Sequence, residues 1–221
     1  MTVVTEAGAP EAAGRVRRRP QQARSRARVE AILGAADRIL AREGYEALTI
    51  RRIAEEAGAP VGSIYQFYPD KSAVVDALGQ RYLEAFRAAI DDLVARALAG
   101  ELTDLVGTTV DVYAELFRSQ RGGMALWAGR HLSPELARAD EASNGVVAEG
   151  LQQIMEHLTG APGGERARRA SRMVVWAANA VLHEAHKGDG EPDPETLDEL
   201  KHMLNAYWGD LRGRLAADAG D

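Results

Sequence analysis

The chain has 221 residues, a formal net charge of −6 and no cysteine. This length suits a small module followed by a larger domain that can bury a core of its own. The lack of cysteine in the sequence excludes disulfides, thiol catalysis and zinc sites built from cysteine.

Charge is distributed unevenly along the chain. Residues 1–71 carry 12 basic and 9 acidic side chains, whereas residues 72–221 carry 15 and 24. Seven arginines and no acid lie between Arg15 and Arg28, and residues 1–22 are predicted to form a disordered, arginine-rich arm. This arm could neutralise DNA phosphates or enter a minor groove, or it could be only a solubilising tail.

Neither a secretion signal nor a membrane span is predicted. The first twenty residues contain no apolar segment of the kind found in secretion signals. The longest apolar run, at residues 173–182, is too short to span a bilayer. We therefore expect a cytoplasmic protein.

Three helices are predicted in residues 23–70, and the last two form a helix-turn-helix. Thr49 is a good N-cap for the second helix, and Gly58 supplies the positive φ that turns the chain sharply after it. Pro60 suits the first turn of the third helix, where its missing N–H removes no hydrogen bond. The small residues that follow would let this helix enter a DNA major groove. The three helices are expected at residues 23–43, 50–57 and 60–67.

Residues 71–221 are also predicted to be helical. Asp70 is expected to cap a long helix that Gly100 stops. Apolar residues at three- and four-residue intervals then indicate five more helices, and no stretch alternates as a strand does. These five are expected at residues 106–121 (ended by Gly122-Gly123), 124–130, 134–159, 165–186 and 195–215. The predicted fold is therefore all-α, with about nine helices: a three-helix helix-turn-helix DNA-binding domain and a larger C-terminal helical bundle.

The helix-turn-helix residues resemble those of a known family. The pattern Thr49-x-x-x-Ile53-Ala54-x-x-Ala57-Gly58-x-x-x-Gly62-Ser63-Ile64-Tyr65-x-x-Tyr68-x-x-Lys71 is similar to the DNA-binding domain of TetR-family transcriptional repressors. The resemblance covers residues 25–85. Two positions depart from the family pattern: Pro60 stands where a serine cap is usual, and Tyr68 stands where phenylalanine is commoner. The resemblance implies a homodimeric DNA-binding regulator.

The expected DNA contacts lie in this unit and at the start of the long helix. The resemblance implies that Thr49, Arg51 and Lys71 bind phosphates, which would set the register on DNA. Val61 suits a thymine methyl group, and Ser63 can hydrogen-bond to a base edge. The alternative is a structural three-helix unit without a DNA partner. The candidate residues are Thr49, Arg51, Arg52, Pro60, Val61, Gly62, Ser63, Tyr65, Gln66, Tyr68 and Lys71.

The helix at residues 165–186 is apolar nearly all round at its centre, which predicts burial on more than one side. With the last helix it resembles the surface from which the family builds a four-helix dimer interface; the alternative is a monomer core. A two-fold dimer would place its recognition helices in successive major grooves of a palindromic operator, roughly 34 Å apart. The candidate interface residues are Val174, Ala178, Val181, Ala185, Leu200, Leu204, Tyr207, Trp208 and Leu211.

A pocket for a small hydrophobic or aromatic effector is predicted in residues 71–221. Apolar walls with a few polar groups are typical of small-molecule sites, although the same residues could be ordinary core. The resemblance implies that the effector releases a repressor from its operator. The alternative is a ligand-independent dimeric regulator whose C-terminal domain serves only dimerisation. The candidate residues are Phe86, Tyr113, Phe117, Trp127, His131, Trp176, Asn179 and His183.

The sequence offers no catalytic motif. The segment His183-Glu184-x-His186 lacks the spacing of the HExxH zinc motif. The sequence contains no P-loop, dinucleotide fingerprint or nucleophile elbow either. We therefore expect no enzyme activity, no metal and no cofactor.

Overall fold

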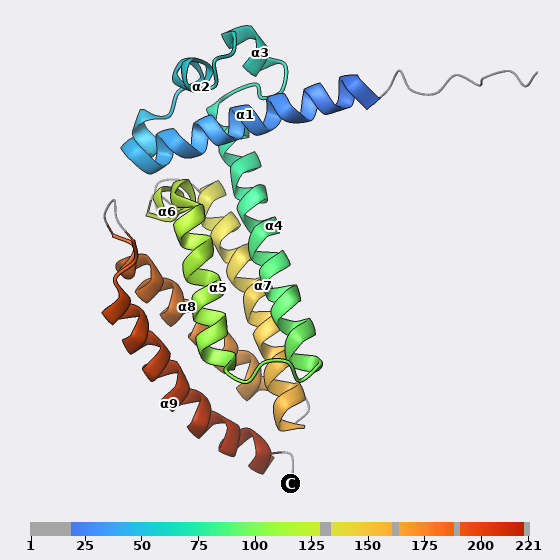
Figure 1. Ribbon diagram of the computed structural model, residues 1–221, viewed down its shortest axis with the longest axis vertical. Helices are drawn as coiled ribbons and strands as arrows, with labels where there is room; N and C mark the ends of the chain where they lie inside the picture. Colours follow the sequence, from blue (N-terminus) through green and yellow to red (C-terminus); the bar gives the residue numbers. More distant parts are fainter. Residues whose placement is uncertain (1–18, 129–133, 161–163, 188–190, 219–221) are drawn as a thin grey trace, which may run out of the picture.

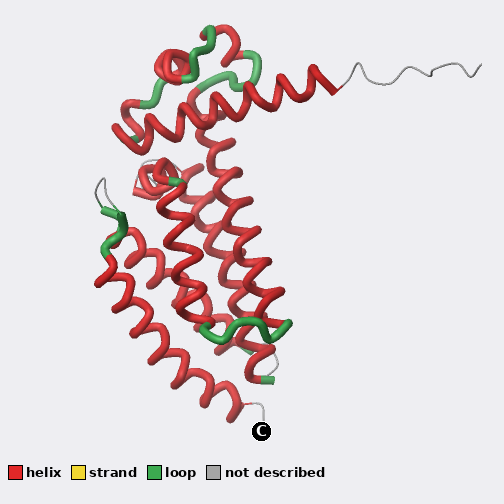
Figure 2. Tube along the Cα trace, in the orientation of Figure 1, coloured by secondary structure: helices red, strands yellow, loops and turns green. Residues whose placement is uncertain are grey.

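The computed structural model describes residues 19–128, 134–160, 164–187 and 191–218. Throughout these residues the regular secondary structure is helical, and the all-α prediction is confirmed (Figures 1 and 2). No helix in this part of the chain is both long enough and apolar enough to cross a membrane. The elements are α1 (Arg19–Glu43), a 3-10 turn η1 (Tyr45–Ala47), α2 (Ile50–Glu56), α3 (Val61–Tyr65), α4 (Lys71–Leu98), α5 (Leu105–Ser119), α6 (Arg121–Ala128), α7 (Pro134–Thr159), α8 (Glu165–Ala185) and α9 (Pro194–Asp218).

The N-terminal region, α1 to α3, lies across one end of α4 (Figure 1). Its cap and its turn are formed by the residues predicted for them. The Thr49 side chain accepts a hydrogen bond from the Arg52 backbone N–H, and Gly58 has a φ of 60°. Its elements enclose one aliphatic core together with the first turns of α4. The fully buried members of that core include Ile32, Ile39, Leu40, Leu48, Ile53, Ile64 and Leu78.

The C-terminal region continues from α4 through α9. The N-cap of α4 is Asp70, whose side chain accepts from the Ala73 N–H, and the helix ends just before Gly100. α4 packs along α7, and α8 lies between α7 and α9 (Figure 1). Because α4 contributes Leu78 to the first core and Ile90 to a second one, it belongs to both regions.

Several helix boundaries differ from the prediction, and two of these differences concern α1 and the helix packed against it. α1 begins at Arg19, so residues 19–22 of the predicted arm are helical; residues 1–18 of that arm lie outside the described part of the chain. The glycines Gly122 and Gly123 do not end α5 but lie within α6. A Cβ on Gly122 would lie 2.2 Å from Asp37 Oδ1 and 2.7 Å from the Asp37 carbonyl oxygen. This glycine therefore permits α6 to pack closely against α1.

Candidate DNA-binding surface and ligand pocket

The short helix α3 is held in the core by one buried side chain, and its outer face is exposed. Ile64 is fully buried in the N-terminal core, whereas Tyr65 is 56% exposed and Val61 is 39% exposed. Open space surrounds Gly62, since a Cβ there would meet nothing within 4 Å. Residues with these exposures can approach another molecule without any rearrangement of the helix.

A residue absent from the predicted site reaches this helix from α1. The Arg28 guanidinium Nη1 donates a hydrogen bond to Ser63 Oγ, at 3.1 Å. Arg24 and Arg26 are exposed on the same helix and make no ion pair within the described residues. A helix over residues 23–43, which includes Arg28, was predicted from the sequence, but the contact of Arg28 with Ser63 was not. α1 therefore carries positive charge to the edge of the recognition helix.

The predicted phosphate-binding residues differ in how strongly their side chains are bound to other residues of the chain. The Arg51 side chain is 84% exposed and pairs only with Glu55, one turn along the same helix. In contrast, Arg52 donates to Glu43 at 2.5 Å and to the Ala47 carbonyl at 3.3 Å, and so ties α2 to the end of α1. This contact lowers the pKa of the Glu43 carboxyl and raises that of the Arg52 guanidinium.

Lys71 and Tyr68 also have partners within the chain. Lys71 Nζ donates to the Tyr45 carbonyl oxygen at 3.1 Å and lies 3.8 Å from the centroid of that tyrosine ring. The Tyr68 ring packs partly buried against the N-terminal core, and this burial raises the pKa of its hydroxyl. Pro60, the N-cap of α3, and Gln66, its C-cap, are both exposed.

An ion-pair network between α1 and α2 fixes the two helices together. Glu56 accepts from Arg38 Nε at 2.7 Å and from Arg42 Nη2 at 2.7 Å. These two hydrogen bonds, Arg42 first, lower the pKa of Glu56 to about 2. The network therefore holds the helix-turn-helix in one orientation on the long first helix.

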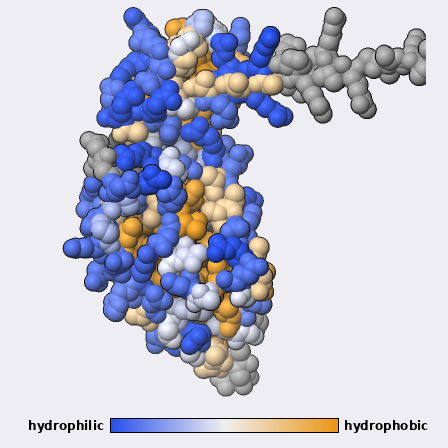
Figure 3. Space-filling view, in the orientation of Figure 1, coloured by the Kyte–Doolittle hydropathy of each residue, from blue (hydrophilic) through white to orange (hydrophobic). Residues whose placement is uncertain are grey.

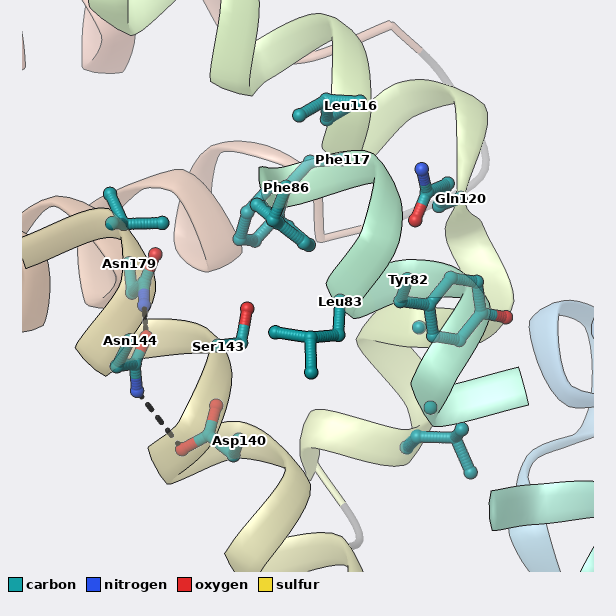
Figure 4. Close-up of a pocket in the computed structure, with 14 residues that line it drawn as sticks. Tyr82, Leu83, Phe86, Leu116, Phe117, Gln120, Asp140, Ser143, Asn144 and Asn179 are labelled. Carbon is teal, nitrogen blue, oxygen red and sulfur yellow. Dashed lines mark hydrogen bonds between the residues drawn. The ribbon is translucent and has the colours of Figure 1, made fainter. Parts of the chain in front are cut away.

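A pocket opens among α4, α5, α6, α7 and α8 (Figure 4). It encloses about 790 Å³ of empty space, its open mouth included. One side is apolar, and polar groups cluster on α7 and α8. Asn179 Nδ2 donates to Asn144 Oδ1 at 2.5 Å, and Asn144 Nδ2 donates to Asp140 Oδ2 at 3.3 Å. The lining residues are Gly79, Tyr82, Leu83, Phe86, Leu116, Phe117, Gln120, Gly123, Leu126, Asp140, Ser143, Asn144, Val147 and Asn179.

Three of the predicted effector residues, Phe86, Phe117 and Asn179, line this pocket. Tyr113 stands behind it, with its ring stacked on Phe86 at a centroid distance of 5.6 Å. His183 is not part of the lining. The prediction is wrong for Trp176, which is 55% exposed and lies near the Arg172 guanidinium.

Trp176 faces outward because its neighbour Val175 takes the buried position on α8. The Trp127 side chain and His131 lie outside the described part of the chain. The sequence reasoning missed the polar side chains of α7. Asp140 and Asn144 stand four residues apart on one helix face, which was the available signal.

The pocket touches the N-terminal region through Tyr82. The Tyr82 hydroxyl donates a hydrogen bond to the Asp37 carboxylate of α1, and Arg81 Nη2 lies 3.9 Å from the same carboxylate. Burial, reinforced by the charge of Asp37, raises the pKa of Tyr82 well above its usual range. α4 is therefore bonded to α1 at the level of the pocket wall.

The predicted dimer residues face inward more than expected. Ala185, Leu200, Leu204 and Leu211 are buried in the core of the subunit itself, so the prediction of a partner-facing surface is wrong for these four. The physical reason is that α8 and α9 pack on α5 and α7 and use these side chains to do so. The remaining five pack partly buried against the same cores: Val174, Ala178, Val181, Tyr207 and Trp208. The exposed large apolar side chains of α8 and α9 are Met173, Trp176 and Met203.

Two family models match the chain. Residues 32–78 match the model described as bacterial regulatory proteins, tetR family, and residues 100–208 match the one described as tetracyclin repressor-like, C-terminal domain. A curated relative, an uncharacterized HTH-type transcriptional regulator from Haemophilus influenzae, is 32% identical over 62 residues. That match covers 28% of this chain and only 33% of the relative's length.

Solved structures share the architecture over most of the chain. A TetR-family transcriptional regulator from Streptomyces coelicolor is 25% identical, with a TM-score of 0.54, and the match covers 83% of this chain and 99% of that one. A TetR transcription regulator from Haloarcula marismortui is 19% identical, with a TM-score of 0.68 and coverages of 84% and 98%. At that lower identity the likeness concerns the fold alone.

Proposed function

Since the chain belongs to the TetR family and is a DNA-binding transcriptional regulator rather than an enzyme, we propose that it is a homodimeric repressor which a small molecule releases from a palindromic operator. The observation that carries this proposal is the course of α4. This helix begins at Lys71, beside the recognition helix, and continues to Phe86 in the pocket wall. Its partner, chromosomal DNA, would place the protein in the bacterial cytoplasm.

The proposed DNA surface consists of α3, the start of α2 and the N-terminal half of α1. Val61 and Gly62 would meet base edges, because they are exposed at the start of α3. Arg51 would bind a phosphate. Arg28 would hold Ser63 in position and add positive charge beside the groove. Arg52, engaged with Glu43, would act as a brace for α2 rather than as a phosphate ligand.

One short recognition helix reads few bases, so useful specificity requires a second copy. We place the dimer interface on the outer faces of α8 and α9 rather than on their buried stripes. Met173 is 53% exposed and Met203 is 44% exposed there. Exposed alanines and a glycine on the same faces would let the helices of two subunits approach closely. These small residues are Ala177, Ala180, Ala206 and Gly209.

The proposed release mechanism uses the shared helix. A ligand in the pocket would contact α4 at Leu83 and Phe86 and shift its position relative to α7. Because Tyr82 bonds α4 to Asp37 of α1, the shift would reach the DNA-binding unit. A preference of about 1–3 kcal/mol for the non-binding conformation is enough to change operator occupancy appreciably.

Selection of bound fragments from a random DNA pool tests the proposal. We expect a palindrome whose half-site centres are one helical turn, about 10–10.5 base pairs, or a multiple of it apart. Val61→Ala should change the base preference at one position of each half-site. Arg51→Ala should weaken binding to all sequences alike and reduce the salt slope by about two, roughly one for each subunit of the proposed dimer. A selection that enriches no sequence, or a single unpaired half-site, would contradict the proposal.

A further inference from the structure

The ligand pocket among α4, α5, α6, α7 and α8 has aromatic walls. Two of the chain's three phenylalanines, Phe86 and Phe117, line it together with Tyr82. The two phenylalanine rings meet nearly edge to face, with centroids 6.1 Å apart. Because aromatic rings favour edge-to-face and offset-stacked contacts with one another, these walls favour an aromatic ligand over an aliphatic one.

The charge of the pocket favours a neutral ligand. Asp140 is the only charged side chain in the described lining. It accepts a hydrogen bond from Asn144 Nδ2 at 3.3 Å and has a further partner within the chain. A cationic ligand would therefore find this carboxylate already engaged, and an anionic ligand would find no positive side chain in the described lining.

Two polar side chains of the lining keep hydrogen-bonding capacity for a ligand, whereas the Asn144 and Asn179 amides are bonded to each other. One is Gln120, the C-cap of α5, whose Oε1 is buried and accepts no hydrogen bond within the described residues. The other is Ser143 of α7, whose hydroxyl makes no hydrogen bond in the same part of the chain and points in the direction of Phe86 (Figure 4).

The positions of Gln120 and Ser143 determine how a ligand can use both. A buried oxygen without a donor costs free energy, so a ligand that brings a donor to Gln120 gains from satisfying it. The terminal torsion of a glutamine amide is soft, which lets Oε1 turn towards a ligand. The two side chains lie on different sides of the pocket (Figure 4). A ligand that bonds to both therefore needs a polar group at each end of its ring.

We propose that the effector is a neutral phenol with a second hydroxyl at the opposite end of the molecule. Its ring packs against Phe86 and Phe117. The phenol hydroxyl donates to Gln120 Oε1, and the second hydroxyl exchanges a hydrogen bond with Ser143. This inference rests on the proposed function of the pocket as an effector site. It adds the chemical class of the ligand and its orientation.

Titration of the full-length protein at pH 7, followed by ligand NMR signals, tests the class of ligand. The probes are tyrosol, which carries both hydroxyls, para-ethylphenol and phenethyl alcohol, which each lack one of them, and the anion para-hydroxyphenylacetate. Tyrosol should bind about fivefold more tightly than either singly hydroxylated probe. The anion should bind at least about tenfold more weakly than tyrosol. Equal binding of tyrosol and the anion, or no gain from either hydroxyl, would overturn the proposal.

A variant at Gln120 tests the phenol end. Gln120→Met removes the acceptor and keeps a side chain of similar length. It should weaken tyrosol binding by about fivefold, to the level of phenethyl alcohol, and leave phenethyl alcohol binding unchanged. The unchanged binding also shows that the variant folds. Its matched control is Gln80→Met, at an exposed position of α4 outside the lining. Tyrosol that binds Gln120→Met as tightly as it binds the wild type would refute the assigned orientation.

A variant at Ser143 tests the other end in the same way. Ser143→Ala should weaken tyrosol binding by about fivefold, to the level of para-ethylphenol, while para-ethylphenol binds both proteins alike. The matched control is Ser72→Ala, at an exposed position near the start of α4. A Ser143→Ala protein that still prefers tyrosol to para-ethylphenol would exclude this serine as the partner of the second hydroxyl.

A second cavity adjoins the pocket and provides a control for the location of the ligand. It lies among α5, α7, α8 and α9, and it shares Val147 and Asn179 with the first pocket. Ala178 lines only the second cavity. Ala178→Leu, checked for its helical content by circular dichroism, should bind tyrosol with unchanged affinity. Loss of tyrosol binding by the folded variant would place the ligand in the second cavity and contradict the proposal.

Operator affinity, measured with and without tyrosol, separates this inference from the proposed function. Tyrosol binding that depends on Gln120 and Ser143 but leaves operator affinity unchanged would support the ligand class and contradict the release mechanism. Operator release by a compound of another class, with no binding of tyrosol, would overturn the ligand class and support the release mechanism.

Discussion

The N-terminal and C-terminal regions pack their apolar side chains differently. The first closes a continuous aliphatic core, whereas the second leaves two cavities between its helices. Leu78 and Leu83, five residues apart on α4, show the contrast: Leu78 is fully buried in the first core, and Leu83 lines the pocket. On the face shown in Figure 3, hydrophobic residues are visible between the helices of the C-terminal region. A helix whose first turns are fixed in a closed core and whose next turns border a pocket can respond to a ligand.

The ion pairs of the two regions also differ, and again the N-terminal region is the more tightly linked of the two. In the N-terminal region most of them join separate helices, as Glu56 does with Arg38 and Arg42; an exception is the pair of Arg51 with Glu55. In the described C-terminal region most of them link residues one turn apart, as in Arg118 with Glu115, and exposed pairs of this kind add little stability. An exception is the pair of Lys201 with Asp111, at 2.7 Å, which joins α9 to α5. Directional bonds therefore fix the shape of the DNA-binding unit more than that of the ligand-binding bundle.

The largest expected effect comes from identical substitutions at the two ends of α4. Leu78→Ala should lower the free energy of unfolding by about 2–5 kcal/mol, because it leaves a cavity in a closed core. Leu83→Ala should lower it by about 1 kcal/mol or less, because this side chain already borders empty space. Urea denaturation of both variants measures the difference. Equal losses would show that the pocket closes in solution and would remove the contrast.

Substitutions at two glycines test the same comparison and should have the next largest effects. Gly122→Ala should destabilise the protein by about 1–3 kcal/mol, because the new Cβ would clash with the Asp37 backbone between α6 and α1. Gly62→Ala should leave stability unchanged or raise it by about 0.5–1 kcal/mol, since open space surrounds this helical position. Its effect should instead be weaker operator binding. Unfolding curves and operator titrations of both variants distinguish these outcomes, and a stable Gly122→Ala protein would contradict the close packing.

Tyr82→Phe tests the bond that joins the two regions. It removes the hydroxyl that donates to the Asp37 carboxylate, and we expect a loss of about 1–2 kcal/mol in the free energy of unfolding, because Asp37 is partly exposed and keeps Arg81 nearby. We also expect a smaller difference in operator affinity between ligand-bound and free protein. A full ligand response in Tyr82→Phe would show that coupling takes another route.

Local features of the fold could be predicted from the sequence, and long-range ones could not. The cap at Thr49 and the turn at Gly58 depend on neighbouring residues, so their chemistry is readable in order along the chain. The contact of Asn179 with Asn144 joins residues 35 positions apart, and no local pattern specifies it. The direction of Trp176 was mispredicted because a helix that is apolar nearly all round does not indicate which side faces the core. Tertiary packing alone decides that side.

The smallest expected effect concerns the pH dependence of the N-terminal network. Arg42 and Arg38 lower the pKa of Glu56 from its ordinary value of 4.5 to about 2 in the folded protein. A carboxyl with a lowered folded pKa binds its proton less tightly when folded than when unfolded. Its stabilising contribution is therefore complete above about pH 4.5 and is lost as the pH falls towards 2.

Glu56→Gln should accordingly be less stable than the wild type at pH 7, and the difference between the two proteins should shrink between about pH 4.5 and pH 2. Urea denaturation across this pH range measures it. The matched control is Glu55→Gln, which removes only the exposed pair with Arg51 and should leave stability nearly unchanged at every pH. If the difference between wild type and Glu56→Gln stayed constant down to pH 2, the carboxylate would not be held by the two arginines. The contrast between a bonded N-terminal region and a loosely bonded C-terminal one would then have to rest on core packing alone.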